Sequence, residues 1–231
     1  FGEALWSVST GYNVSFESYK LRYSYESLTT PASLFEYDMN SDHAELLKQQ
    51  EIPSGYSREC YHAERLFSKA RDGESIPVSL VYRRDRFQKN RCPLLLYAYG
   101  SYGMSIDPWF STNRISLLDR GFVFAIAHIR GGSEMGRQWY ETGRQKHKLN
   151  TFYDYIDVGK DLLASGYAKE SGLYGMGGSA GGLLMGAVAN LAPNLFKGLI
   201  AEVPFVDVIS TMLDDSIPLT TAEYDEWGNP H

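Results

Sequence analysis

The chain has 231 residues, of which 43% are hydrophobic and 22% charged. This composition is typical of a globular protein with one α/β domain, or one domain and part of another. No apolar run approaches the ~20 residues of a membrane-spanning helix, which argues against a membrane protein. The net charge is −6, and the sequence has no cluster of Lys and Arg that could neutralise phosphates. Both features argue against nucleic acid as a partner.

The two cysteines, Cys60 and Cys92, lack the spacing of metal ligands and favour a reduced, cytoplasmic setting. We therefore expect neither a metal site nor a cofactor. Because the first residue is Phe1 rather than Met, we expect the natural amino terminus to be missing. The sequence sets no expectation for the oligomeric state.

Residues 1–55 are predicted to be the remnant of an all-β domain and a linker. Large and polar side chains alternate over residues 19–26 and again over residues 33–38, with a break at residues 29–32. This period of two indicates two half-buried antiparallel strands. Two strands cannot bury a core by themselves, so a larger β domain is expected around them.

Residues 56–231 are predicted to form an α/β domain, because strand and helix patterns alternate along them. Strands are expected at residues 65–70, 76–83, 94–99, 121–129, 173–176 and 198–203, and helices at 115–120, 151–165 and 183–191. The first two strands flank a tight turn at residues 71–74. Thr151 and Asp154 suit the start of their helix, and Gly166 suits its end. This order predicts a mostly parallel sheet covered on both faces.

The most informative motif is Gly177-Gly178-Ser179-Ala180-Gly181, which lies between an apolar strand pattern and a helix pattern. In that context a G-x-S-x-G match predicts a nucleophile elbow, with Ser179 as the catalytic nucleophile. The following helix would point its first N–H groups at a developing oxyanion. We predict the backbone N–H of Ala180 as one donor, and a tyrosine hydroxyl from residues 97–103 as the other.

A serine nucleophile also needs a base and an acid, which follow the serine in this architecture. The only histidine after Ser179 is His231, which has no element beyond it to hold it in place. His128 lies at the end of a predicted buried strand and precedes the serine, which indicates a structural or site-wall residue rather than the base. We therefore expect the acid and the base beyond residue 231, and this stretch to be inactive alone.

Acidic residues gather near the carboxyl-terminal end of the sequence. After Lys197 there is no Lys or Arg, but there are Glu202, Asp207, Asp214, Asp215, Glu223, Asp225 and Glu226. A surface of one sign beside an active site suits a cationic ligand. Acidic loops can also serve solubility alone, and composition leaves both interpretations open.

Several segments together resemble the prolyl oligopeptidase family of serine peptidases, and its oligopeptidase B branch most closely. The matching segments are residues 96–103 (LYAYGSYG), 116–123, 129–132, 138–140, 176–182 (MGGSAGG), 204–208, 211–221 and 226–230 (EWGNP). The resemblance implies an α/β-hydrolase domain, incomplete at its carboxyl-terminal end, preceded by the end of a β-propeller. It also implies a peptidase that cleaves short basic peptides after Arg or Lys.

The resemblance further implies roles for individual residues. Ser179 matches the nucleophile, and Tyr99 matches an oxyanion-hole tyrosine. Glu223 matches a carboxylate that holds the basic side chain of the substrate. Asp225 stands at the companion position, where the family usually has Glu. Asp107 matches an acid of the neighbouring subsite, where Trp109 replaces the second acid that some relatives carry.

Two alternatives stay open from the sequence. One is another serine hydrolase of the same fold, such as a carboxylesterase or an acylaminoacyl peptidase. The acidic segment and the β remnant argue against an esterase, whose acyl pocket is usually apolar. The other is a non-catalytic binding protein that keeps the hydrolase fold, against which the intact elbow argues.

Overall fold

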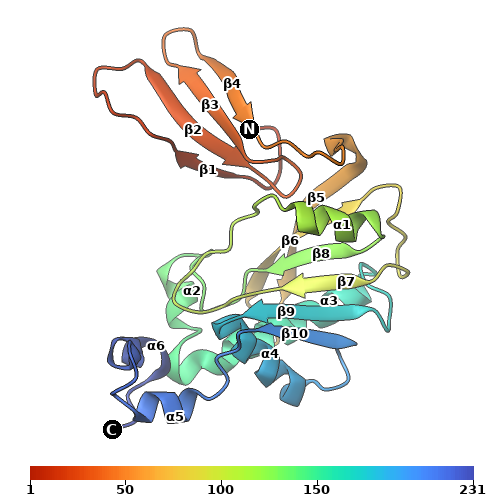
Figure 1. The fold of residues 1–231 in the computed structure, drawn as a ribbon. Helices are drawn as coiled ribbons and strands as arrows, with labels where there is room; N and C mark the ends of the chain where they lie inside the picture. Colours follow the sequence, from red (N-terminus) through yellow and green to blue (C-terminus); the bar gives the residue numbers. More distant parts are fainter.

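The computed structural model describes all 231 residues, which form two parts joined by a linker (Figure 1). A four-stranded antiparallel sheet from the amino-terminal end lies above a six-stranded mixed sheet that carries helices on both faces. None of the helices combines the length and the hydropathy that crossing a bilayer requires.

The amino-terminal sheet, called the blade below, has its strands in chain order. They are β1 (Ser7–Thr10), β2 (Lys20–Glu26), β3 (Ser33–Asp38) and β4 (His43–Gln49). The sequence predicted β2 and β3 but not the two outer strands. The reason is that β1 has only four residues and β4 is exposed along its whole length, so neither shows a clear alternation of burial.

The larger sheet has the strand order of an α/β-hydrolase. Its strands are β5 (Tyr61–Lys69), β6 (Ser75–Arg83), β7 (Leu94–Tyr97), β8 (Val123–Ala127), β9 (Leu173–Gly178) and β10 (Gly198–Glu202). The spatial order is β10-β9-β7-β8-β6-β5, with β7 to β10 parallel and β5 and β6 antiparallel to their neighbours. The predicted fold class, an α/β-hydrolase sheet preceded by the end of a propeller, is confirmed.

The helices are α1 (Thr112–Asp119), α2 (Arg137–Glu141), α3 (Lys148–Ala164), α4 (Ala180–Leu191), α5 (Val208–Leu213) and α6 (Tyr224–Trp227). Three single turns of 3₁₀ helix accompany them: η1 (Arg58–Cys60), η2 (Gln145–His147) and η3 (Thr220–Glu223). Side chains of α1 pack with one face of the sheet, and those of α3 and α4 pack with the other. The sheet is therefore covered on both faces, as predicted.

The start of α3 differs from the sequence prediction. The helix begins at Lys148, so Thr151 and Asp154 lie within it and are fully buried rather than capping it. The carboxylate of Asp154 accepts hydrogen bonds from Nε and Nη2 of Arg130, at 2.8 and 2.5 Å. The hydroxyl of Thr151 donates to the carbonyls of Arg130 and Gly143. Residue types that suit a helix start are used here to hold the loop after β8.

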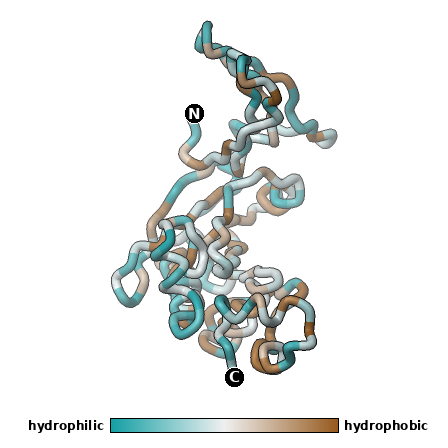
Figure 2. Tube along the Cα trace, turned by 90° about the vertical axis from the view of Figure 1, so that its left-hand side faces the viewer, coloured by the Kyte–Doolittle hydropathy of each residue, from teal (hydrophilic) through white to brown (hydrophobic).

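Hydropathy along the chain is uneven (Figure 2). Hydrophobic and hydrophilic segments are mixed in the blade at the top of that view, and hydrophobic segments also occur near the carboxyl terminus at the bottom. Around α5 the side chains of Val203, Val206, Ile209 and Leu213 are exposed. In this segment apolar side chains are exposed as well as polar ones. The acidic residues near 223 follow it in the chain.

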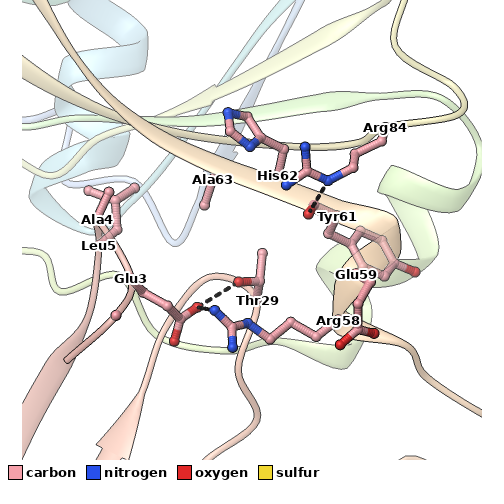
Figure 3. A pocket seen from close by; sticks show the side chains of 11 residues that line it. Glu3, Ala4, Leu5, Thr29, Arg58, Glu59, Tyr61, His62, Ala63 and Arg84 are labelled. Atoms are coloured by element: carbon pink, nitrogen blue, oxygen red, sulfur yellow. Dashed lines mark hydrogen bonds and ion pairs between the residues drawn. The ribbon is translucent and has the colours of Figure 1, made fainter.

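The junction between the two parts is organised around Glu3 (Figure 3). Its carboxylate accepts hydrogen bonds from hydroxyls of the blade, namely those of Tyr25, Ser27, Thr29 and Thr30. It also forms an ion pair with Arg58 of η1, at 3.3 Å. A pocket of about 400 Å³ opens beside this pair and is lined by residues of both parts. Glu3 thus joins the turn between β2 and β3 to η1, which directly precedes β5.

We expect Glu3→Gln to destabilise this junction at neutral pH but not in acid. Burial alone would raise the pKa of Glu3, but the four hydroxyl donors outweigh burial and hold that pKa below its ordinary value of 4.5. The carboxylate therefore stabilises the fold above pH 4.5, and this contribution is lost as the pH falls through the lowered pKa. The substitution should cost about 1–3 kcal/mol at pH 7. Thermal unfolding of both proteins at pH 7 and pH 3 measures this, and an equal deficit at both pH values would contradict it.

Candidate active site

The turn between β9 and α4 holds Ser179 in a strained conformation. Its φ and ψ angles are 55° and −114°, a region that residues other than glycine rarely adopt. The backbone N–H of Ser179 donates to the carbonyl of Glu202 at 2.9 Å, and its own carbonyl accepts from the N–H of Phe205 at 3.0 Å. The side chain of Ser179 is exposed. The backbone is thus fixed from both sides while the hydroxyl stays accessible.

Glycines around the serine allow the strand and the helix to approach closely. A Cβ on Gly177 would lie 2.3 Å from the carbonyl oxygen of Gly181, and one on Gly182 would lie 2.5 Å from Cα of Pro204. Both distances are too short for any side chain. Gly178 has ordinary space instead, because its nearest neighbour would be 3.6 Å away. The elbow therefore requires glycine at positions 177 and 182 but has space for a side chain at position 178.

Two hydrogen-bond donors lie near Ser179, namely the backbone N–H of Ala180 and the hydroxyl of Tyr99. Ala180 is the first residue of α4, so its N–H has no partner within the helix. Tyr99 follows β7, and Ala180 follows Ser179 at the end of β9. Because β7 and β9 are parallel neighbours, Tyr99 and Ala180 lie at the carboxyl ends of adjacent strands. Burial raises the pKa of the Tyr99 phenol, and the neighbouring Ser179 side chain acts in the opposite direction. Since the net pKa is raised, the phenol stays protonated near neutral pH and can donate a hydrogen bond.

The structure brings Glu223 to the same region. Its Oε2 accepts hydrogen bonds from the hydroxyl of Tyr102 at 2.7 Å and from Nε1 of Trp227 at 2.8 Å. The rings of Tyr102 and Tyr99 are neighbours, with centroids 6.3 Å apart. Glu223 is therefore bonded to the tyrosine loop, residues 98–103, which carries Tyr99.

The side chains of the other two predicted substrate-binding residues form no hydrogen bond with this cluster. Asp225 is exposed and its carboxylate forms no hydrogen bond, although its carbonyl accepts from Arg144 and Gln145. Asp107 is also exposed and accepts a hydrogen bond from the hydroxyl of Ser7, at 3.2 Å. Because Ser7 begins β1, Asp107 faces the blade. Of the three carboxylates, only Glu223 contacts the tyrosine loop.

Two functional candidates were missed by the sequence analysis, namely Lys148 and Glu226. Both are largely buried next to the tyrosine loop, with 13% and 3% of their side-chain surface exposed. Lys148 stands in a polar stretch, and Glu226 was counted with the acidic residues of the carboxyl-terminal segment. The only signal in the sequence was the position of Glu226 directly before Trp227-Gly228, inside a motif that the family resemblance includes.

A second serine has a histidine and a carboxylate beside it. The hydroxyl of Ser79 lies 2.6 Å from Nε2 of His128, and Nδ1 of that histidine lies 3.3 Å from Oε1 of Glu134. Ser79 is fully buried and His128 is 2% exposed, so no substrate reaches this chain of groups. None of the five histidines forms a hydrogen bond with Ser179. No group of three or more His, Cys, Asp or Glu residues is placed to hold a metal ion.

A strained, accessible serine at a strand-to-helix turn of this sheet, with two donors beside it, defines an α/β-hydrolase site. Residues 108–231 match the model of the prolyl oligopeptidase family, and residues 3–50 match the N-terminal beta-propeller domain of prolyl oligopeptidase. The chain belongs to the prolyl oligopeptidase family, as its motifs predicted.

Individual relatives agree with this assignment. The chain is 54% identical over 229 residues to dipeptidyl aminopeptidase BI of Pseudoxanthomonas mexicana, covering 99% of this chain and 32% of the relative. Among solved structures it is similar to oligopeptidase B from Leishmania major, with a TM-score of 0.93 and 45% identity over 100% of this chain and 32% of that one. It is also similar to oligopeptidase B from Trypanosoma brucei with covalently bound antipain. That comparison has a TM-score of 0.92 and 42% identity, and it covers 100% of this chain and 33% of the other. The chain thus spans about a third of the length of each.

Proposed function

We propose that the complete protein is a serine endopeptidase that cleaves short peptides after Arg or Lys through an acyl-enzyme on Ser179. The observation that carries the proposal is the exposed, strained Ser179 beside the side chain of Tyr99. The serine oxygen attacks the scissile carbonyl while a base removes its proton. The resulting oxyanion accepts hydrogen bonds from the N–H of Ala180 and the hydroxyl of Tyr99. The amine then leaves with a proton, and water hydrolyses the acyl-enzyme.

Glu223 supports the preference for a basic side chain. A guanidinium that enters a partly desolvated site needs an anionic partner, and a carboxylate supplies bidentate acceptors. The aromatic rings of Tyr102 and Trp227 beside Glu223 also favour a cation. We assign Asp225 as a second, more solvated carboxylate of this pocket and Asp107 to the neighbouring subsite.

We assign residues 1–55 to the end of the propeller and its linker, and residues 56–231 to the hydrolase domain, since the sheet changes between β4 and β5. Because no histidine contacts Ser179, we propose that residues 1–231 alone do not turn over substrate. The free thiols of Cys60 and Cys92 favour a cytoplasmic location.

A second candidate function is the release of dipeptides from an amino terminus. The name of the Pseudoxanthomonas relative, a dipeptidyl aminopeptidase, favours it. The two functions differ in one requirement, because an aminopeptidase needs a free α-amino group and an endopeptidase does not. A peptide with an acetylated amino terminus and an internal arginine distinguishes them: we expect cleavage after the arginine.

The test uses the complete protein. A phosphonate probe directed at serine nucleophiles should label Ser179 and leave Ser79 unmodified, as read by mass spectrometry of the peptides. An arginine amide should be hydrolysed far better than a neutral amide with the same amine leaving group, and also better than a neutral ester. Labelling at any serine other than Ser179 would refute the nucleophile, and a preference for the neutral ester would favour an esterase.

A further inference from the structure

A buried ion pair lies beneath the loop that carries the oxyanion tyrosine. Nζ of Lys148, at the start of α3, is 3.8 Å from Oε1 of Glu226, in α6. Both side chains are largely removed from solvent. Burial lowers the pKa of Lys148 to about 8, against the opposing effect of Glu226. Desolvating two charges is costly, so a pair in this place is not explained by its contribution to stability alone.

The pair holds consecutive residues of the tyrosine loop. Nζ of Lys148 donates to the carbonyl of Gly100 and to the hydroxyl of Ser101, both at 2.6 Å. Oε1 of Glu226 accepts from the backbone N–H of Tyr102 at 3.0 Å. The three residues that directly follow Tyr99 are therefore each bonded to one member of the pair.

The loop has no space in which to shift at Gly100. Its φ is +72°, and a Cβ there would lie 2.6 Å from the methyl group of Thr151 and 2.8 Å from Cδ1 of Ile129. The loop is thus packed against Thr151 and Ile129, while its polar groups are bonded to Lys148 and Glu226. When either charged residue is replaced, the backbone at Gly100 therefore has no room to move toward Thr151.

The same pair also fixes the carboxylate assigned to the substrate cation. Glu226 stands three residues after Glu223, and Trp227 next to it donates to Glu223 through Nε1. Tyr102, whose N–H is bonded to Glu226, donates to Glu223 through its hydroxyl. The hydroxyl of Tyr140 donates to Oε2 of Glu226 at 2.7 Å and completes the coordination of that carboxylate.

We propose that Lys148 and Glu226 are positioning residues of the active site, which together set the tyrosine loop against α6. This buried pair fixes the position of the oxyanion donor Tyr99 relative to the cation-binding Glu223. The inference rests on the function proposed above. Neither residue is a catalytic residue, because the polar atoms of both are bonded to the loop and to Tyr140 rather than to Ser179.

The experiment compares Lys148→Met with Arg71→Met in the complete enzyme. Arg71 also pairs with a carboxylate of α3, at 2.8 Å from Asp157, but it is partly exposed and does not contact the loop. We expect Lys148→Met to lower kcat about 10- to 100-fold on arginine and neutral substrates alike, since a misplaced oxyanion donor costs up to about 10²–10³ in kcat. It should also raise KM for the arginine substrate only. Arg71→Met should leave kcat and both KM values unchanged.

If Lys148 had a purely structural role, Lys148→Met would lower the thermal midpoint. It would not combine a lower kcat on both substrates with a higher KM for the arginine substrate only. If Lys148→Met does not fold, Tyr140→Phe provides the milder test, because it removes only one hydroxyl from Glu226. The same pattern with a smaller amplitude is expected. Unchanged kcat and KM in the folded variant would overturn the inference. Ser179→Ala, measured in parallel, tests the proposed function separately, since retained activity there refutes the nucleophile whatever Lys148 does.

Discussion

Replacing Ser179 with alanine in the complete protein is expected to lower kcat by about 10⁶-fold, as loss of the nucleophile does in serine peptidases. The fold should persist, because the backbone of the elbow is held by Glu202 and Phe205 and not by the serine hydroxyl. Substrate binding should change little, since Glu223 and its two donors are unaffected. Single-turnover and steady-state assays with an arginine amide measure the effect.

The matched control is Ser79→Ala. Ser79 has a histidine neighbour but is fully buried, so its removal should leave kcat within about twofold of the parent value. If Ser179→Ala keeps full activity while Ser79→Ala abolishes it, the assignment of the nucleophile is wrong. Near-complete loss in Ser179→Ala alone supports the elbow as the reactive centre.

Replacing Glu223 with glutamine is expected to lower kcat/KM for arginine substrates selectively. Truncating one partner of a buried, charge-assisted contact costs about 2–5 kcal/mol. At 1.4 kcal/mol for each factor of ten, this corresponds to about 30-fold to several thousand-fold. Glutamine keeps acceptors for Tyr102 and Trp227 but loses the charge that a guanidinium needs. Neutral substrates should lose less than about threefold.

Asp225→Asn provides the comparison for this prediction. Asp225 is exposed and forms no side-chain hydrogen bond, so solvent screens its charge and its loss should matter less than that of Glu223. Equal losses on arginine and neutral substrates in Glu223→Gln would contradict the pocket assignment. A larger selective loss in Asp225→Asn than in Glu223→Gln would transfer the main role to Asp225.

The sequence predicted well those features that depend on neighbouring residues. The elbow at Ser179 is a local pattern, in which strand, glycines, serine and helix follow one another, so it could be recognised without coordinates. The alternation of strands and helices likewise predicted a mostly parallel sheet covered on both faces. The resemblance supplied Tyr99 and Glu223, whose proximity to the serine depends on the strand order β9-β7 and on the return of α6 to the tyrosine loop.

Features that depend on tertiary burial were not predictable in the same way. Lys148 and Glu226 are charged residues in polar stretches, and only the packing of α3 and α6 around the loop buries them. Thr151 and Asp154 have the chemistry of helix caps, but their polar groups are bonded to the loop after β8 instead. In each case the partner is distant in the chain, so no local pattern marks it.

The buried arrangement of Ser79, His128 and Glu134 bears on how enzymes are sought in coordinate collections. A template search that ranks serines by interatomic distance to a histidine would select Ser79 here and pass over Ser179. Backbone strain and solvent access rank the two serines in the opposite order. Torsion angles and accessibility therefore favour Ser179 over Ser79 as the reactive serine.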